Sequence, residues 1–150
     1  MHRSARALMK QSLDAHLSRR RRYDVIDLGS AISRGQSLTH RDLLEPYLGS
    51  YTGVDIKANA NVDVLMSRPY TIPCRSRSAD VVISGQAFEH IPFPWATAME
   101  IRRVLRPGGL AIITAPSRGH VHDVYDCWRI CRMRHIRHYV PLRIMSASWC

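Results

Sequence analysis

The sequence predicts an α/β fold with a doubly wound, mostly parallel sheet of about five strands. Two observations support this prediction. Short runs rich in valine, isoleucine and leucine alternate along the chain with segments in which apolar residues recur at helical spacing. Acidic residues or glycines follow directly after three of these runs. Alternating strands and helices are typical of a parallel sheet that helices cover on both faces, and such sheets bind ligands beyond the carboxyl ends of their strands.

Length and composition are those of a single globular domain. The 150 residues suffice for one hydrophobic core, and the content of 45% hydrophobic and 23% charged residues is ordinary for a globular protein. No apolar run approaches the roughly 20 residues that span a bilayer, and the basic N-terminal segment lacks the apolar core of a secretory signal. We therefore expect a cytoplasmic protein that does not enter a membrane.

The net charge of +10 is concentrated at the two ends of the chain. Residues 1–23 contain seven lysines or arginines and one acid, whereas residues 127–150 contain five arginines and no acid. The segment between them has ten basic and eleven acidic residues and is nearly neutral. Binding of nucleic acid through both basic ends is one alternative, but the neutral middle and the lack of interleaved aromatic residues argue against it.

The cysteines predict neither disulfides nor a metal site. Four cysteines at irregular spacing do not form a disulfide framework in a chain of this kind. Cys127, Cys131, His135 and His138 are zinc ligands by type. On one continuous helix, however, they would extend over about 16 Å, which is too far for one tetrahedral ion.

The N-terminal part of the chain predicts a helix, a strand and a loop that contains glycine. Apolar residues recur at helical spacing over residues 4–17, and residues 23–28 form a short β-branched run typical of a buried strand. Gly29 and Gly35 follow this run. Glycine allows the backbone to turn sharply and to approach a ligand closely, so this loop is the first candidate for a binding site.

A short helix is expected after the glycine loop. Ser37 or Thr39 can cap its N-terminus, Leu44 and Leu48 lie one turn apart, and Gly49 can end it. This helix would connect the glycine loop with the second strand.

The second strand is expected at residues 51–55. It ends at Asp55, 26 residues beyond Gly29, where an acidic side chain can accept hydrogen bonds from both ribose hydroxyls of a nucleoside. A role for Asp55 in capping the next turn is the alternative. A third strand is expected at residues 61–66, and because the connection to it is too short for a helix, we expect an abbreviated crossover or an irregular strand.

The fourth strand is expected at residues 79–84, the clearest buried run of the chain, and Gly85 and Gln86 follow its carboxyl end. Pro94 suits the first turn of a helix. The residues expected on the core-facing side of this helix are Met99, Ile101, Val104 and Leu105. A turn at residues 106–109 leads to a fifth strand at residues 110–115.

Together these segments resemble the class I S-adenosylmethionine-dependent methyltransferases, in particular the small type 11-like methyltransferase domains. The resemblance rests on residues 25–30, 53–56, 79–91 and 104–110. They are similar in order and spacing to the family's first-strand glycine loop, second-strand acid, fourth-strand end and turn before the fifth strand. Residues 115–129 also resemble a subgroup of small domains. The resemblance implies a Rossmann-like fold, S-adenosyl-L-methionine as cofactor and methyl transfer as the reaction.

The resemblance also implies roles for individual residues. Those that would surround the methionine part of the cofactor are Asp27, Gly29, Ser30 and Gly35. Asp55 would hold the ribose, and Ile56 would lie against the adenine. Those that would close the site from the fourth strand are Ser84, Gly85 and Gln86. His90 is the candidate for handling a substrate proton, with capping or packing as the alternative role.

Three features depart from the family pattern. Ala31 replaces the usual second glycine of the loop, and Arg68 stands where the family often has an acid that meets the adenine amino group. The family also adds a helix and two strands after the fifth strand, whereas residues 130–150 are rich in arginine and histidine with little periodicity. We therefore expect an N-terminal helix and basic linker (1–22), a cofactor-binding domain (23–129) and an irregular basic tail, with a sheet that is incomplete at its C-terminal edge because of a truncated or frame-shifted end.

The leading functional hypothesis is methyl transfer to an unidentified acceptor, such as a small molecule. Positioning and exclusion of water accelerate an in-line displacement, so no catalytic triad is expected. The alternative is a non-catalytic relic or an interaction module, which Ala31 and Arg68 favour. A dinucleotide dehydrogenase does not fit because the G-x-G-x-x-G fingerprint is absent. The sequence indicates neither the acceptor nor the oligomeric state.

Overall fold

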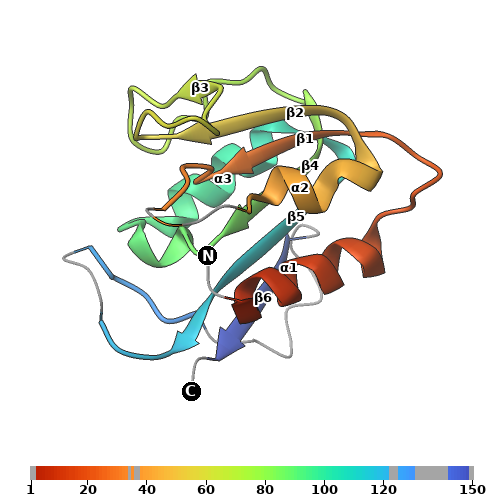
Figure 1. Cartoon of the computed structure of the whole chain (residues 1–150). Helices are drawn as coiled ribbons and strands as arrows, with labels where there is room; N and C mark the ends of the chain where they lie inside the picture. The colour runs from red at the N-terminus through yellow and green to blue at the C-terminus, as the bar shows by residue number, and fades with distance from the viewer. Residues whose placement is uncertain (1–2, 34, 36–37, 122–124, 131–141, 149–150) are drawn as a thin grey trace.

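The structure is a computed structural model that describes residues 3–33, 35, 38–121, 125–130 and 142–148 (Figure 1). Its strands are β1 (Tyr23–Leu28), β2 (Leu48–Asp55), β3 (Val64–Leu65), β4 (Ala79–Gly85), β5 (Leu105–Arg118) and β6 (Leu142–Ser148). Its helices are α1 (Arg3–His16), α2 (His40–Leu44) and α3 (Pro94–Val104), and its short 3-10 helices are η1 (Glu45–Tyr47) and η2 (Phe88–His90).

The strands form one sheet in the order β3-β2-β1-β4-β5-β6, and every neighbouring pair is parallel. The chain therefore builds outwards from β1, first through β2 and β3 and then, on the other side, through β4, β5 and β6. This is the doubly wound arrangement that the alternation of strands and helices predicts. The predicted fold class is confirmed, and the five predicted strands are all present.

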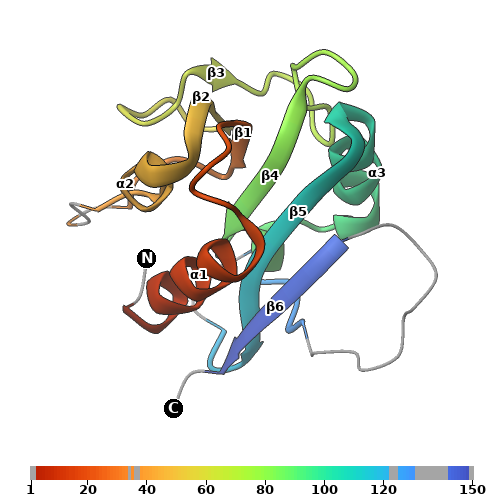
Figure 2. The same cartoon turned by 90° about the vertical axis from the view of Figure 1, so that its right-hand side faces the viewer.

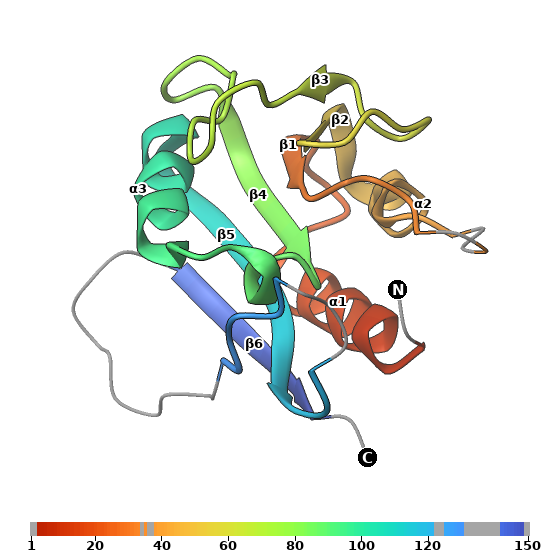
Figure 3. The ribbon, with the colours of Figure 1, turned by 90° about the vertical axis from the view of Figure 1, so that its left-hand side faces the viewer.

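Helices cover both faces of the sheet. Met9 and Leu13 of α1 pack in one apolar cluster with Ile83 of β4, whereas Ile101 of α3 packs in a second cluster with Val82. Because successive side chains of a strand point to opposite faces, Val82 and Ile83 belong to different clusters. Figures 2 and 3 show α1 and α3 on opposite sides of β4 and β5.

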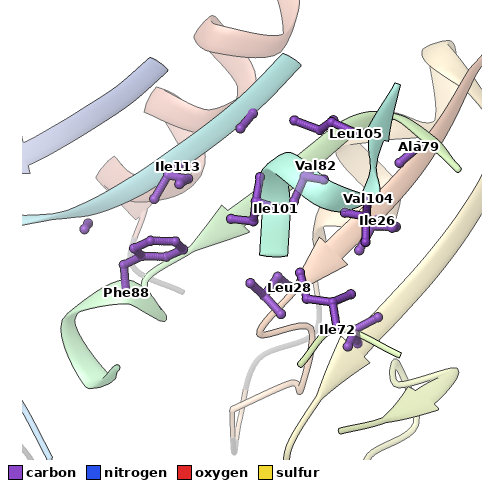
Figure 4. Close-up of a cluster of buried hydrophobic side chains, with 13 residues drawn as sticks. Ile26, Leu28, Ile72, Ala79, Val82, Phe88, Ile101, Val104, Leu105 and Ile113 are labelled. Carbon is purple, nitrogen blue, oxygen red and sulfur yellow. The ribbon is translucent and has the colours of Figure 1, made fainter. Parts of the chain in front are cut away.

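The cluster beneath α3 also anchors the segment that follows β4. Phe88 of η2 is 2% exposed and packs in this cluster with Ile113 of β5 and Leu28 of β1 (Figure 4). Full burial of one such side chain contributes about 1.5–3 kcal/mol. Phe88 therefore fixes η2 against the sheet, directly after the strand end where a ligand is expected.

α2 begins as predicted but ends early. Thr39 is its N-cap and forms a capping box, whereas Ser37 lies outside the described residues. The helix ends at Leu44 because Pro46, which lacks a backbone N–H, stands in η1. The residues after η1 belong to β2, so the prediction that the helix continues to Gly49 was wrong.

The third strand is short. β3 contains two residues, and Val64 and Leu65 pair with Val54 and Asp55 at the end of β2. The connection from β2 contains no helix, as expected for an abbreviated crossover, and the strand is shorter than the expected range of residues 61–66.

The prediction that Met99 lies on the core-facing side of α3 was wrong. Its side chain is 63% exposed, whereas Ile101 and Val104 are fully buried. The buried stripe of α3 runs through Thr97, Ile101 and Val104. Met99 precedes Ile101 by two residues, which places it about 200° around the helix and on the opposite face. Leu105 is buried as expected, but as the first residue of β5.

The predicted irregular tail contains a strand. β6 lies within residues 130–150 and pairs in parallel with β5. The dense arginines and histidines before it obscured this strand in the sequence. The division of the chain at residues 22 and 129 stays a prediction.

Cys131, His135 and His138 lie outside the described residues, so the structure does not place this group of zinc-type ligands. The helices in the described part of the chain are all too short or too polar to cross a membrane.

Candidate functional site

The carboxyl ends of β1, β2 and β4 lie side by side, and the loops that follow them form the candidate site. Asp27 near the end of β1 pairs in register with Gly53 of β2 and with Ile83 of β4. Figure 1 shows the arrowheads of these three strands pointing to the same side of the molecule. Most of the residues singled out in the sequence lie in these strand ends or loops, as expected for a parallel sheet.

Gly29 brings the loop after β1 into direct contact with the loop after β4. Its φ of 80° is in the left-handed region, and its N–H donates a hydrogen bond to the carbonyl of Val54 over 2.8 Å. A Cβ atom at this position would lie 2.5 Å from the Cβ atom of Ala87. The backbone conformation and the close contact therefore both require glycine.

Asp55 fastens the glycine loop to the end of β2. Its Oδ2 accepts a hydrogen bond from the N–H of Ala31 over 2.9 Å, and its Oδ1 accepts one from the N–H of Lys57, also over 2.9 Å. The turn-capping role is therefore present, through Lys57. Each carboxylate oxygen has two lone pairs, so Asp55 retains acceptor capacity for a ligand. The adjacent Ile56 is 65% exposed, which leaves its apolar surface available.

Ser30 lies deeper in the same loop and is 5% exposed. Its carbonyl accepts a hydrogen bond from Nδ2 of Asn61 over 2.9 Å. Its Oγ is buried and has no hydrogen-bond partner among the described residues. A Cβ atom at Gly53 would lie 2.8 Å from this Oγ, so the glycine in β2 leaves the space that the Ser30 side chain occupies.

Asp27 is fully buried, and both of its carboxylate oxygens face protein groups. The hydroxyl of Tyr51 donates a hydrogen bond to Oδ2 over 2.7 Å, and Nδ1 of His40 lies 3.1 Å from each oxygen. Burial, with the nearby carboxylate, raises the pKa of Tyr51 above its ordinary value. The phenol therefore stays protonated and keeps donating to Asp27.

His40 is the candidate that the sequence analysis missed. It is the first residue of α2 and is 7% exposed. Its ring lies against Gly85, because a Cβ atom on Gly85 would be 2.4 Å from both Cε1 and Nε2 of the imidazole. The contacts of His40 with Asp27 and Gly85 connect α2 with β1 and β4. One signal in the sequence could have pointed to His40. A helix that directly follows the glycine loop begins at the same edge of the sheet as that loop.

The three candidates from β4 differ in their surroundings. Ser84 is fully buried, and its hydroxyl donates to the carbonyl of Leu28 over 2.8 Å, so it holds β4 against β1. Gly85 ends the strand. Gln86 has a φ of 59°, and its N–H donates to the carbonyl of Thr114 over 2.8 Å. Gly85 and Gln86 therefore lie at the loop, whereas Ser84 supports the strand pair.

Gly35 was predicted to lie beside the cofactor, but no described contact connects it with the other predicted site residues. Its φ is 79°, and a Cβ atom on it would meet no atom of the described residues within 4 Å. Residues 34 and 36 on either side lie outside the described part of the chain.

His90 ends η2 and is covered by residues 125–130. Its Nδ1 lies 3.3 Å from the carbonyl oxygen of Tyr125. A carbonyl only accepts, so Nδ1 donates in this contact. Nε1 of Trp128 donates to the carbonyl of Pro92 over 3.2 Å, which holds the covering segment in place.

A hollow of about 780 Å³ lies at the opposite end of the sheet. It is lined by the end of α3 and the start of β5, including Arg77, Arg102 and Arg103, at the amino ends of β4 and β5. It is therefore separate from the candidate site. The described residues contain no group of three side chains that could hold a metal ion.

Comparison with known proteins connects this site with one family. Residues 30–113, more than half of the chain, match the family described as "Methyltransferase domain". An uncharacterized methyltransferase of Mycobacteroides abscessus is 41% identical over 54 residues, which are 33% of this chain and 21% of that protein. One of Mycobacterium avium is 31% identical over 80 residues, which are 50% of this chain and 28% of that protein. The chain thus covers less than a third of the length of these relatives.

Solved structures share the fold. The YcgJ protein of Bacillus subtilis superposes with a TM-score of 0.57 at 20% identity, over 77% of this chain and 53% of that chain. A SAM-dependent methyltransferase from Aquifex aeolicus has a TM-score of 0.50 at 18% identity, over 71% of this chain and 63% of that chain. The matched family segment runs from the glycine loop into β5 and contains Asp55 and the end of β4. On this agreement of sequence, topology and strand-end loops, the chain belongs to the class I S-adenosylmethionine-dependent methyltransferases.

Proposed function

We propose that this domain binds S-adenosyl-L-methionine at the carboxyl ends of β1, β2 and β4 and transfers its methyl group to an acceptor. The observation that carries the proposal is the position of Asp55. This partly exposed carboxylate ends β2, fastens the glycine loop through Ala31 and keeps lone pairs for a ligand. The buried Oγ of Ser30, which has no hydrogen-bond partner among the residues that the structure describes, supports a polar ligand at the same loop.

The residues present fit this cofactor. Asp55 would accept hydrogen bonds from the ribose hydroxyls, and Ile56 would offer apolar surface to the adenine. Gly29 and Ser30 would lie along the methionine part. Gly85 and Gln86 would close the site from β4. Asp27 and Ser84 would support the site without a side-chain contact to the cofactor, because their side chains are hydrogen-bonded to other protein groups.

When bound, the cofactor would supply an electrophilic methyl group, to whose carbon an acceptor nucleophile would bond in line while the carbon–sulfur bond breaks and S-adenosylhomocysteine leaves. The contribution of the chain is to hold the two reactants in line and to exclude water, which can supply most of the acceleration. His90 would take the proton that a hydroxyl or amine acceptor releases; its place in η2, directly after the end of β4, supports this role. A general base of this kind contributes roughly 10²–10⁴-fold to a rate.

Calorimetry with S-adenosylhomocysteine tests the proposal. We expect micromolar affinity in the unaltered protein and loss of binding in Asp55→Ala. Glu45→Ala is the matched control, because Glu45 is an exposed acid in η1, before the amino end of β2 and not in the loops after the carboxyl ends of the strands. Circular dichroism should show both variants folded. The absence of heat at millimolar ligand would contradict the proposal.

Turnover separates catalysis from binding alone. An active domain should consume S-adenosylmethionine in the presence of at least one class among amine, hydroxyl, thiol and carbon acceptors, and His90→Gln should slow that reaction. Tight binding without consumption would instead favour the relic or interaction module. The cytoplasmic location stays a prediction.

A further inference from the structure

The hollow at the amino ends of β4 and β5 is lined by arginines on one side and apolar side chains on another. Its volume of about 780 Å³ lies in the range of small-molecule sites. Arg77 belongs to the loop before β4 and Arg102 to the last turn of α3, and the described residues that line the hollow include no acid. The apolar lining comes from Met99, which is 63% exposed, Leu105 and Pro107.

Arg103 fixes the loop before β4 against α3. Its Nε and Nη2 each donate to the carboxylate of Glu100 over 2.8 Å. Its Nη1 donates to the carbonyl of Cys74 over 2.9 Å and to Oγ of Ser76 over 3.2 Å. Nη2 also donates to the carbonyl of Ile72 over 2.7 Å. All five N–H groups of this guanidinium are therefore engaged, so Arg103 holds the wall of the hollow together and has no donor left for a ligand.

Arg106 is also bound by protein groups. Its Nη1 lies 2.8 Å from Oδ2 of Asp24 and 2.9 Å from Oδ2 of Asp80, near the starts of β1 and β4. Hydrogen bonds to these two carboxylates raise the pKa of Arg106. The charge of Arg106 is therefore balanced within the protein.

The guanidinium groups of Arg77 and Arg102 are different, because both side chains are exposed and neither has a partner among the described residues. The last two carbonyls of α3, those of Arg103 and Val104, accept the N–H groups of Arg77 and Ser78 over 2.9 Å and 2.8 Å, so neither guanidinium is needed to cap the helix. Arg102 can interact with the helix dipole, but Arg77 lies outside the helix. Arg77 also has a left-handed φ of 55°, a conformation that is unfavourable for arginine and that clusters at ligand-binding positions.

We propose that the hollow binds a small soluble molecule in which a phosphate monoester is joined to an apolar group, with Arg77 and Arg102 on the phosphate and Met99 beside the apolar group. The guanidinium fork binds phosphate oxygens in pairs. A phosphate monoester carries a charge of about −1.5 to −2 at neutral pH, which two guanidinium groups balance, whereas a carboxylate supplies one charge only. The site goes beyond the proposed function, because the cofactor loops lie at the other end of the sheet.

Titration with phenyl phosphate, inorganic phosphate and benzoate at equal ionic strength, followed by the NMR shifts of backbone amides, tests both parts of the contact. We expect saturable shifts around the hollow at millimolar phenyl phosphate. Inorganic phosphate, which lacks the apolar group, and benzoate, which has one negative charge, should both bind more weakly. Met99→Ala should weaken the binding of phenyl phosphate and leave that of inorganic phosphate unchanged.

The arginines are tested by Arg77→Gln and Arg102→Gln. Each should weaken phenyl phosphate binding by about tenfold, as expected when a hydrogen bond to a charged group is lost. Arg75→Gln is the matched control, because Arg75 is exposed in the same loop and does not line the hollow. It should leave the affinity unchanged. Urea denaturation should show all three variants as stable as the unaltered protein.

Three outcomes would overturn the proposal. The first is the absence of shifts around the hollow at millimolar phenyl phosphate. The second is an equal loss in Arg75→Gln and Arg77→Gln, which would indicate only a general attraction of a basic protein for anions. The third is sedimentation with phosphatidic acid vesicles that Arg77→Gln abolishes, without any binding of phenyl phosphate, which would assign the contact to a lipid. Binding of S-adenosylhomocysteine should be the same in every variant, so the proposed function is tested separately.

Discussion

The backbone N–H of Ala31 donates a hydrogen bond to Oδ2 of Asp55 over 2.9 Å. The residue that departs from the family's glycine pattern thus takes part in the site through its backbone alone. Its φ is not positive, so the conformation does not require glycine. The departure at Ala31 is therefore compatible with a formed cofactor loop.

We accordingly expect Ala31→Gly to change the affinity for S-adenosylhomocysteine by less than about twofold. The variant should lower the free energy of unfolding by about 0.4–1 kcal/mol, because glycine gives the unfolded chain more freedom. Calorimetry and urea denaturation measure the two quantities. A large gain in affinity would instead indicate that alanine obstructs the loop.

Gly29→Ala and Gly108→Ala form a matched pair. Both glycines have left-handed φ values, 80° and 78°, but a Cβ atom at Gly108 would meet no atom within 4 Å in the described part of the chain. The backbone term of about 1–2 kcal/mol is therefore common to both variants. The contact of Gly29 with Ala87 should add about 1–3 kcal/mol of overpacking to its variant alone. If urea denaturation shows equal losses of unfolding free energy in the two variants, the loops after β1 and β4 can move apart without a cost in stability.

Gly85→Ala should be destabilising because of His40. A Cβ atom would lie 2.4 Å from the imidazole, and Gly85 has no left-handed φ that would add backbone strain. We expect a loss of about 1–3 kcal/mol in the unaltered background and a smaller loss in His40→Ala. The coupling in this double-mutant cycle should fall in the range of about 0.5–3 kcal/mol that residues in contact show. Additive losses would contradict the packing of His40 on Gly85.

Glu100 should make stability depend on pH in the acid range. The Arg103 guanidinium, 2.8 Å away, lowers the pKa of this carboxyl, and the N–H of Ile72 assists. Because the pKa is lower in the folded state, the stabilisation is complete above the unfolded pKa of about 4.3 and is lost as the pH falls through the folded value.

The unfolding free energy of the unaltered protein should therefore exceed that of Glu100→Gln most at pH 6, and the difference should shrink toward pH 3. Glu45→Gln is the control, because Glu45 is an exposed acid. A difference that stays constant with pH would refute the assignment to the Glu100 charge.

Substitutions in α3 should report its corrected orientation. Ile101→Ala removes a fully buried side chain and should cost about 2–5 kcal/mol. Met99→Ala changes a side chain that is 63% exposed and should stay within about 0.5 kcal/mol. Urea denaturation of both variants checks the contrast. Similar losses would mean that Met99 is covered in solution.

Local patterns were sufficient for β1 to β5 and for the place of Asp55 at the end of β2, but not for β6. The β-branched runs at β1 and β4 predict buried strands, and the acid at the end of β2 follows from the spacing of one strand-helix-strand unit. His40 was not predictable in this way, because its meaning comes from Asp27 and Gly85, which only the folded sheet brings next to it. The buried state of Asp27 was missed for the same reason. An acid at a strand end can face the ligand or the interior, and the local sequence is the same in both cases.

The packing of α1 on the sheet has a consequence for the order of folding. Met9 and Leu13 share an apolar cluster with Ile112 of β5, and Figure 2 shows α1 beside β5 and β6. Met9 and Ile112 are about a hundred positions apart in the chain, so this contact closes one of the longest loops of the domain. Contacts of this kind form late and slow the folding reaction. During synthesis on the ribosome, the part of the apolar face of α1 that packs on β5 therefore stays uncovered until β5 emerges.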